Sequence, residues 1–261
     1  MHPVLFHAFG LTIYAYGVLV ALAFIAGFTM ITRRAAKAGE NPDDYLEAAL
    51  WFIIAGIGGA RIFYFLWFPQ VFFANPLGTL LSSGGLVWYG GVIGVLLAIL
   101  IYTRLKKIDL FTFTDIVSPA AALGLAIGRI GCLMAGCCFG SACALPWAIH
   151  YPVTHETHGI PVHPAPLYET ALMLLVMALL LRLDRNKPFR GFTTGWFFIL
   201  AGIVRFAVEA VRGDRLVWLA GLDLSASQVV SLLGTLLGLG ILAIGKKQQS
   251  GNPIDSNDTL L

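Results

Sequence analysis

Three arginines stand inside segments of the chain that are otherwise apolar: Arg61, Arg129 and Arg205. An arginine at the centre of a membrane-crossing helix costs at least about 2.5–3.5 kcal/mol on insertion scales, so each needs an anionic partner or a wet cavity. A guanidinium group can hold a carboxylate or a phosphate through two parallel hydrogen bonds. The obvious anion in a bilayer is a lipid phosphate, so the arginines predict a site for a lipid headgroup.

An ordinary ion pair is the alternative explanation for Arg205. Glu209 follows at i,i+4 on the same helix face, and Arg212 extends the stripe. Arg61 and Arg129 have no acidic residue within a helical turn. The acids that other segments could supply are Glu47, Asp115 and Glu169. Because these acids are so few, we expect the arginines to bind an external anion.

Glycines accompany two of the arginines. Arg129 lies in Gly128-Arg129-Ile130-Gly131, and Arg61 follows Gly58-Gly59-Ala60. Other glycines crowd one later segment: Gly84, Gly85, Gly90, Gly91 and Gly94. Close helix packing through small residues is common in membranes and explains many of these glycines. It does not explain an arginine set among them, which favours close approach of a lipid.

All four cysteines fall within twelve residues: Cys132, Cys137, Cys138 and Cys143. Three interpretations stay open. The cysteines are small buried side chains without a chemical role, or Cys143 forms a disulfide with one of the others, or they bind a metal with a histidine of the following loop. The histidines of that loop are His150, His155, His158 and His163. The spacing is not that of a zinc motif, so we expect no metal and no cofactor.

The elements that carry these residues are membrane helices. The chain has 261 residues, of which 58% are hydrophobic and 12% charged, and its mean hydropathy is +0.81. A soluble domain carries about twice that charged fraction, and the net charge of +3 does not indicate a nucleic-acid partner. Segments near the length of about 20 residues that crosses a bilayer are 10–31, 46–68, 84–102, 116–139, 167–181, 192–211 and 224–244. We therefore predict an all-α integral membrane protein of about seven transmembrane helices.

The basic residues predict the orientation of these helices. Twelve of the 17 Lys and Arg residues lie on alternate connections, after the first, third, fifth and seventh segments. The positive-inside rule then places the N-terminus outside and the C-terminus in the cytoplasm. No cleavable signal peptide is visible at the start of the chain. We expect one polytopic domain over residues 1–247 and a polar, disordered tail over 248–261.

Six blocks of sequence resemble the prolipoprotein diacylglyceryl transferase family and occur in its order across nearly the whole chain. They are Tyr16-Gly17, Gly59-Ala60-Arg61-Ile62-Phe63-Tyr64, Trp88-Tyr89-Gly90-Gly91-Val92-Ile93-Gly94, Gly128-Arg129-Ile130-Gly131 through Gly140, His163-Pro164-Ala165-Pro166-Leu167-Tyr168-Glu169, and Arg205-Phe206-Ala207-Val208-Glu209. The resemblance implies a multi-pass enzyme of the bacterial cytoplasmic (inner) membrane. It would move the diacylglyceryl group of phosphatidylglycerol to the lipobox cysteine of a prelipoprotein signal peptide, release glycerol phosphate and begin lipoprotein maturation.

The resemblance also implies which residues form the site. Arg129 and Arg205 match the essential arginines of the family, and Glu209 matches its neighbouring acid; with Tyr89 the arginines are the expected catalytic residues. The expected substrate-binding residues are Arg129, Arg205, Glu209, Tyr16, Arg61, Gly90, Gly91 and Gly140. Preorganised cations in a cavity of low dielectric constant would stabilise the charge of the departing phosphate.

The chain departs from the family pattern in the same blocks. Tyr89 stands where many members have histidine, and a phenol with an ordinary pKa of about 10 is a poor general base. Cys132, Ala135 and Cys137 replace two asparagines and a glutamate of the family signature, and Ala201 replaces a tyrosine. These changes leave the acceptor and the base open.

Three competing functions follow from these observations. A related lipid-headgroup transferase with another acceptor would explain the departures. A transporter of an anionic substrate would explain the arginines, although the chain shows no convincing repeat of the kind common in transporters. A thiol-redox or metal-binding membrane protein would explain the cysteines.

Overall fold

The computed structural model describes residues 4–8, 11–74, 76, 78, 87–213, 217–219 and 224–251. Among them, seven helices are long and apolar enough to cross a membrane. These helices are α1 (Ala15–Lys37), α2 (Pro42–Trp67), α5 (Trp88–Lys106), α6 (Leu110–Ala135), α7 (Ala165–Leu183), α8 (Phe192–Glu209) and α9 (Ala226–Gly251). The predicted fold class is confirmed; the orientation of the termini stays a prediction.

Short elements connect the long helices. The helical ones are α3 (Pro69–Ala74) and the 3-10 turn η1 (Asp184–Asn186). The strands form three antiparallel pairs: β1 (Val4–Ala8) with β2 (Leu11–Tyr14), β3 (Ile149–His150) with β4 (Pro161–Val162), and β5 (Val217–Leu219) with β6 (Leu224–Ser225).

Most predicted helix boundaries differ from the structure by a few residues, and three of the differences change what the segment is. The first helix begins at Ala15 instead of Gly10, because the residues before it form the β1–β2 hairpin. The fourth ends at Ala135 instead of Phe139, because Gly136 adopts a left-handed φ of 80°, which stops a helix. The last helix continues through residues 248–251, which we had placed in the disordered tail; the rest of that tail lies outside the described residues.

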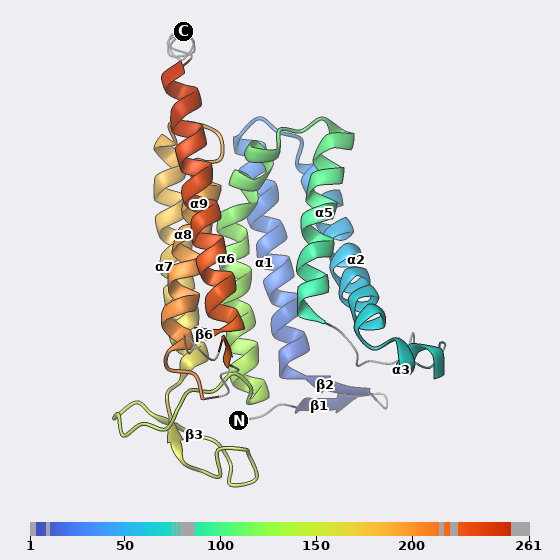
Figure 1. Cartoon of the computed structure of the whole chain (residues 1–261), viewed down its shortest axis with the longest axis vertical. Coiled ribbons are helices and arrows are strands. Elements are labelled where there is room, and N and C mark those ends of the chain that lie inside the picture. The colour runs from blue at the N-terminus through green and yellow to red at the C-terminus, as the bar shows by residue number, and fades with distance from the viewer. Residues whose placement is uncertain are drawn as a thin grey trace. The chain divides into compact units, whose positions relative to one another are not determined.

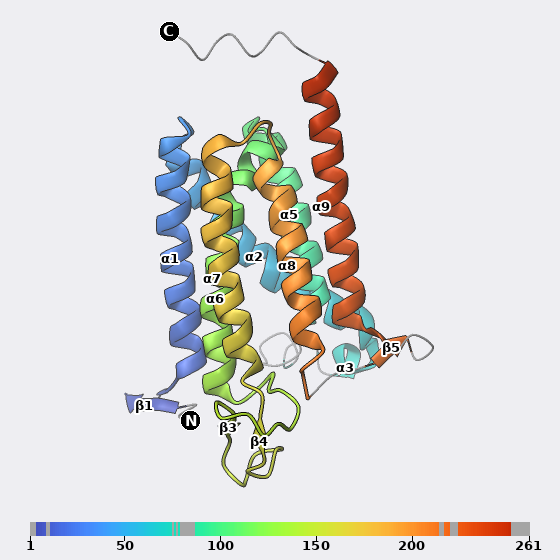
Figure 2. The same ribbon diagram turned by 90° about the vertical axis from the view of Figure 1, so that its left-hand side faces the viewer.

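The chain forms two compact units, the first made of Met1–Met30 with Thr114–Leu261 and the second of Ile31–Phe113. In the first unit, α8 lies between α7 and α9 (Figures 1 and 2). Glycines allow α8 and α9 to approach closely: a methyl group on Gly195 would lie 2.7 Å from the side chain of Leu242, and one on Gly202 would collide with Thr235. The core of this unit is made of apolar side chains from α6, α7 and α8: Ala122, Ala126, Ala165, Met173, Val176, Leu180, Val204 and Val208.

A buried carboxylate on α6 fixes the start of α8. Asp115 is fully buried and accepts hydrogen bonds from the backbone N–H of Gly191 and of Thr194, at 2.9 Å each, and from the Thr194 hydroxyl at 2.8 Å. The first N–H groups of a helix have no partner within the helix, and a negative charge there is favourable. Asp115 therefore caps α8, the helix that carries Arg205 and Glu209.

In the second unit, α2 and α5 pack against each other through glycines. A methyl group on Gly59 would collide with the carbonyl of Gly90, one on Gly90 with Phe63, and one on Gly94 with the carbonyl of Ala55. These glycines thus have a packing role. Gly84 and Gly85, which we had grouped with them, lie outside the described residues.

Candidate functional site

Five charged side chains alternate in sign where α6 ends, α7 begins and α8 ends. Glu169 binds the guanidinium of Arg129 at 3.0 Å and that of Arg205 at 3.2 Å. Glu209 binds Arg205 at 2.6 Å and Arg212 at 3.1 Å. The two glutamate side chains are only 5% and 3% exposed. Buried ions are tolerated when they are paired and hydrogen-bonded, and this charge row meets that condition.

Neighbouring polar contacts hold the row in place. Arg129 comes from α6, Glu169 from the first turns of α7, and Arg205 from α8. The Thr170 hydroxyl donates to the carbonyl of Ala126 at 3.0 Å and so ties α7 to α6. The Ser227 hydroxyl, on α9, accepts from Arg205 at 3.0 Å. The guanidinium groups are therefore positioned by four helices.

Arg129 and Arg205 meet at one carboxylate, each binding a different oxygen of Glu169. The two guanidinium groups therefore lie on the same side of the helices, as a shared site for one anion requires. The ion pair that we had considered for Arg205 with Glu209 is present. The expected shortage of buried acids is wrong for Arg129, because Glu169 is its acidic partner. With Arg212 the row still holds one more cation than anions.

Sequence reasoning missed the central place of Glu169, which we had named only as a nearby acid. The signal was its position next to an apolar stretch that the chain places in a helix, where an ionisable residue is costly and usually functional. The neighbouring Tyr168 was also missed. Its hydroxyl accepts from the indole N–H of Trp147 at 2.7 Å and lies 3.3 Å from Nδ1 of His163.

Backbone contacts join the loop after α6 to the segment that carries Arg212. Gly140 N–H donates to the carbonyl of His163 at 3.0 Å, and Ser141 N–H donates to Val211 at 2.8 Å. A methyl group on Gly140 would collide with His163. Gly140 therefore has a structural reason to be glycine, and its expected contact with substrate stays a prediction.

Tyr16 lies against α6 close to Arg129. A methyl group on Gly131 would lie 3.0 Å from the Tyr16 ring, so the ring packs closely on α6 at this glycine. The Tyr16 side chain is about half exposed, which leaves it accessible at the edge of the charge row.

Tyr89 and Arg61 belong to the second unit. Val87 N–H donates to the carbonyl of Ala60 at 3.2 Å, so the turn of α5 with Tyr89 lies beside the turn of α2 with Arg61. Tyr89 is 45% exposed. The expected roles of Tyr89, Arg61, Gly90 and Gly91 in the site stay predictions.

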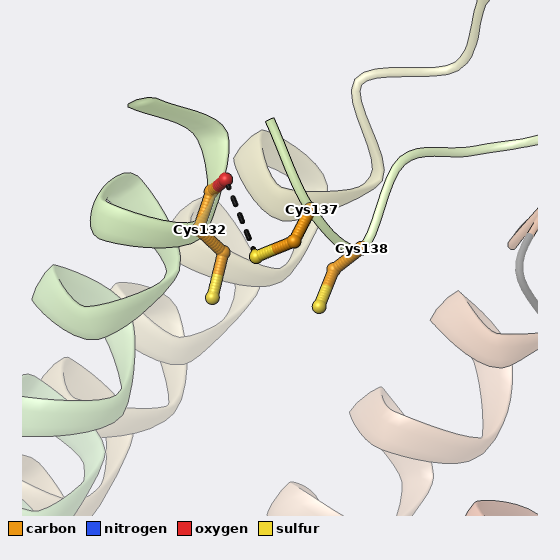
Figure 3. Close-up of side chains that lie close together, drawn as sticks. All are labelled: Cys132, Cys137 and Cys138. Atoms are coloured by element: carbon orange, nitrogen blue, oxygen red, sulfur yellow. Dashed lines mark hydrogen bonds between the residues drawn. The ribbon is translucent and has the colours of Figure 1, made fainter. Parts of the chain in front are cut away.

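Three of the cysteines lie together beside Arg129. The sulfur atoms of Cys132, Cys137 and Cys138 lie close together (Figure 3), all within 4.8 Å of one another. All four cysteines are free thiols. Cys143 is not part of this group, and no described histidine joins it. The expected placement of Cys137 and Cys138 on the helix is wrong, because the helix ends before them at Ala135.

Neighbouring thiols and nearby cations act on the Cys138 sulfur. The Cys132 and Cys137 thiols adjoin it and the Arg212 and Arg129 guanidinium groups lie near it, so the pKa of Cys138 is held well below its ordinary value. The nearest guanidinium nitrogen of Arg129 is 3.7 Å from this sulfur. The pKa of Cys137 is raised by the same contacts with its neighbours.

Comparison with known proteins identifies the family. The family model described as prolipoprotein diacylglyceryl transferase matches residues 3–244. The chain belongs to the prolipoprotein diacylglyceryl transferase family. Phosphatidylglycerol–prolipoprotein diacylglyceryl transferases of Clostridium tetani and Finegoldia magna are 32% and 34% identical to it; the alignments cover 94% and 95% of this chain and 98% and 97% of those proteins. The Idiomarina loihiensis enzyme of that name is 34% identical, over 94% of each chain. The matched residues include both units, the charge row and the cysteine loop.

Proposed function

We propose that this protein transfers the diacylglyceryl group of phosphatidylglycerol to the lipobox cysteine of prelipoproteins in the bacterial cytoplasmic membrane, and that both units serve as one transferase domain. The observation that carries the proposal is the meeting of Arg129 and Arg205 at one buried carboxylate. Two guanidinium groups that reach one carboxylate can also reach one lipid phosphate. The names of the relatives supply the two substrates.

The reaction joins a thiol sulfur to a glyceryl carbon. The carbon–oxygen bond to the phosphate breaks, and the phosphate leaves with the bonding electrons as glycerol phosphate. Negative charge gathers on the phosphate in the transition state, so preorganised cations stabilise it more than they stabilise the bound lipid. The lipid-binding roles belong to Arg129, Arg205, Arg61 and Tyr16.

Arg129 is better placed than Arg205 to take the phosphate. One of its terminal nitrogens binds Glu169 at 3.0 Å, while the other has a longer contact, 3.7 Å, with the Cys138 sulfur. In contrast, both terminal nitrogens of Arg205 bind oxygens, from Glu169, Glu209 and Ser227. Arg129 can therefore give up its contact with the Cys138 sulfur and bind a phosphate, while its ion pair with Glu169 is kept.

The test is a transfer assay with purified protein, phosphatidylglycerol in mixed micelles and a cysteine-containing lipobox peptide. We expect thioether-linked diacylglyceryl peptide and glycerol phosphate in equal amounts. Arg129→Ala should lower the initial rate by about 10²–10³-fold, the loss typical of one oxyanion donor, while the exposed Arg104→Ala should match the wild type. Release of glycerol phosphate without peptide modification would indicate another acceptor and contradict the proposal.

A further inference from the structure

The loop after α6 brings three thiols to one point. Cys132 lies in the last turn of α6, and Cys137 and Cys138 follow in the loop (Figure 3). Cys137 N–H donates to the carbonyl of Cys132 at 3.1 Å, which folds the chain back on the helix end. The sulfur of Cys137 also points to that carbonyl, at 3.6 Å. The clustering is therefore fixed by backbone contacts.

The backbone at this point is in an uncommon conformation. Cys138 has a left-handed φ of 59°, two residues after Gly136 with its φ of 80°. Glycine adopts this conformation without cost, but a cysteine does not. Strained residues of this kind gather at functional sites, where the surrounding structure holds them. Here the strained residue carries one of the three sulfurs.

The sulfur spacing suits a thiophilic cation. With Zn–S bonds of about 2.3 Å, the sulfurs of a tetrahedral site lie about 3.8 Å apart. The three sulfurs lie within 4.8 Å of one another, so small side-chain rotations would complete the site. Among the described residues the group has three members, which is the ligand number of zinc sites that keep their fourth position open to water or substrate.

We propose that Cys132, Cys137 and Cys138 bind one thiophilic cation of the Zn²⁺ type, and that its open position takes the thiolate of the acceptor cysteine. The site can be reached from water, because Cys137 is exposed. Three thiolates and a divalent cation carry a net negative charge, which the guanidinium of Arg129 beside Cys138 would compensate. The same guanidinium is better placed for the lipid phosphate than that of Arg205, so the acceptor sulfur and the lipid would meet beside it.

The second half of this inference rests on the proposed function. The acceptor thiol gives its proton to water when its sulfur binds the cation. That sulfur then forms a bond to the glyceryl carbon, the carbon–oxygen bond breaks, and the phosphate leaves with the bonding electrons as glycerol phosphate. No oxidant and no protein base are required, since the cation lowers the pKa of a thiol that it binds.

The first experiment measures the cation itself. Full-length protein in detergent is reduced, loaded with Zn²⁺ or Co²⁺, freed of excess metal and analysed for metal content. We expect one equivalent per chain, and for Co²⁺ the visible absorption of a tetrahedral thiolate site. Cys132→Ser, Cys137→Ser and Cys138→Ser should each lose at least about 10-fold in metal affinity. The matched control is Cys143→Ser, which removes a cysteine outside the cluster and should bind metal as the wild type does.

The second experiment tests the open position. Adding the lipobox peptide to the Co²⁺ protein should change the visible spectrum, whereas the same peptide with serine for cysteine should not. Chelation should lower the transfer rate at least about 10-fold, and Zn²⁺ should restore it. If the peptide changes the spectrum but no diacylglyceryl transfer occurs, the metal site is supported and the proposed function is overturned. The inference is overturned if the reduced wild type binds no metal, if its cysteines are found as a disulfide, if the thiol peptide leaves the spectrum unchanged, or if the chelated enzyme transfers at the full rate.

Discussion

Helices α6, α7 and α8 of the first unit and helices α2 and α5 of the second are equally apolar, but different contacts hold them together. In the first unit, buried ion pairs and side-chain hydrogen bonds cross between the helices, with Glu169 binding an arginine on each neighbour. In the second, backbones touch at Gly59, Gly90 and Gly94. Glycine contacts fix only how close two helices lie, whereas charged contacts also fix which side chains face an incoming ligand. The comparison therefore points to the first unit for chemistry.

The largest expected effect comes from removing the anion that the two arginines share. Glu169→Ala leaves Arg129 without its carboxylate in a buried setting, and loss of one partner of a buried ion pair typically costs about 3–5 kcal/mol. We expect a lower unfolding temperature in detergent and a loss of transfer activity of at least about 10²-fold. Glu169→Gln keeps the shape and one acceptor oxygen, and should lose less of both. An alanine variant as stable as the wild type would show that the charge row does not hold the unit together.

The next effect tests the glycine contact of the second unit. Gly90→Ala places a methyl group against Phe63 and the carbonyl of Gly59, and overpacking of this kind costs about 1–3 kcal/mol. Gly58→Ala is the matched control on α2, since a methyl group there would meet nothing within 4 Å. Thermal unfolding of the two variants should separate them. If they unfold at the same temperature, glycine packing is not what fixes α2 against α5.

Tyr89→Phe asks whether the second unit contributes to catalysis. As a hydrogen-bond donor to the phosphate or the leaving oxygen, the phenol should contribute about 10- to 100-fold to the rate, the equivalent of one polar contact. We expect that loss in the initial transfer rate over a range of pH, at matched expression. A Tyr89→Phe enzyme as inactive as Arg129→Ala would mean that the phenol takes the thiol proton.

The smallest effect is expected for an ion pair at the end of α5. Lys106 binds Asp44 at 3.0 Å and Glu47 at 2.6 Å, but its side chain is about one-third exposed and Glu47 more so. Exposed pairs contribute little, because water and salt screen them. Lys106→Met should leave both unfolding temperature and transfer rate unchanged within error. A clear loss of stability would mean that charged contacts matter as much in the second unit as in the first.

Much of the fold could be predicted from the sequence, because bilayer thickness sets the length of an apolar helix and the seven segments are separated by charged or polar connections. The hairpin before α1 could not, since its residues are as apolar as the helix that follows. Arg129, Arg205 and Glu209 were found because charges in apolar segments are costly. The pairing of Arg129 with Glu169 could not be found, because it depends on which helices are neighbours. The meeting of Cys132 with Cys137 and Cys138 was hidden as well, since it needs the helix to end at Ala135.

The charge row and the Asp115 cap also bear on how the chain enters the membrane. Helix α6 brings Asp115 and Arg129, α7 brings Glu169, and α8 brings Arg205 together with the N–H groups that Asp115 binds. Each of these side chains is costly in lipid until its partner is present, and the partners arrive on later helices. Helices α6 and α7 should therefore stay at the insertion machinery, or leave it together, until α8 has been synthesised. Biogenesis of this unit would then be a cooperative release of three helices, with α8 as the segment that completes it.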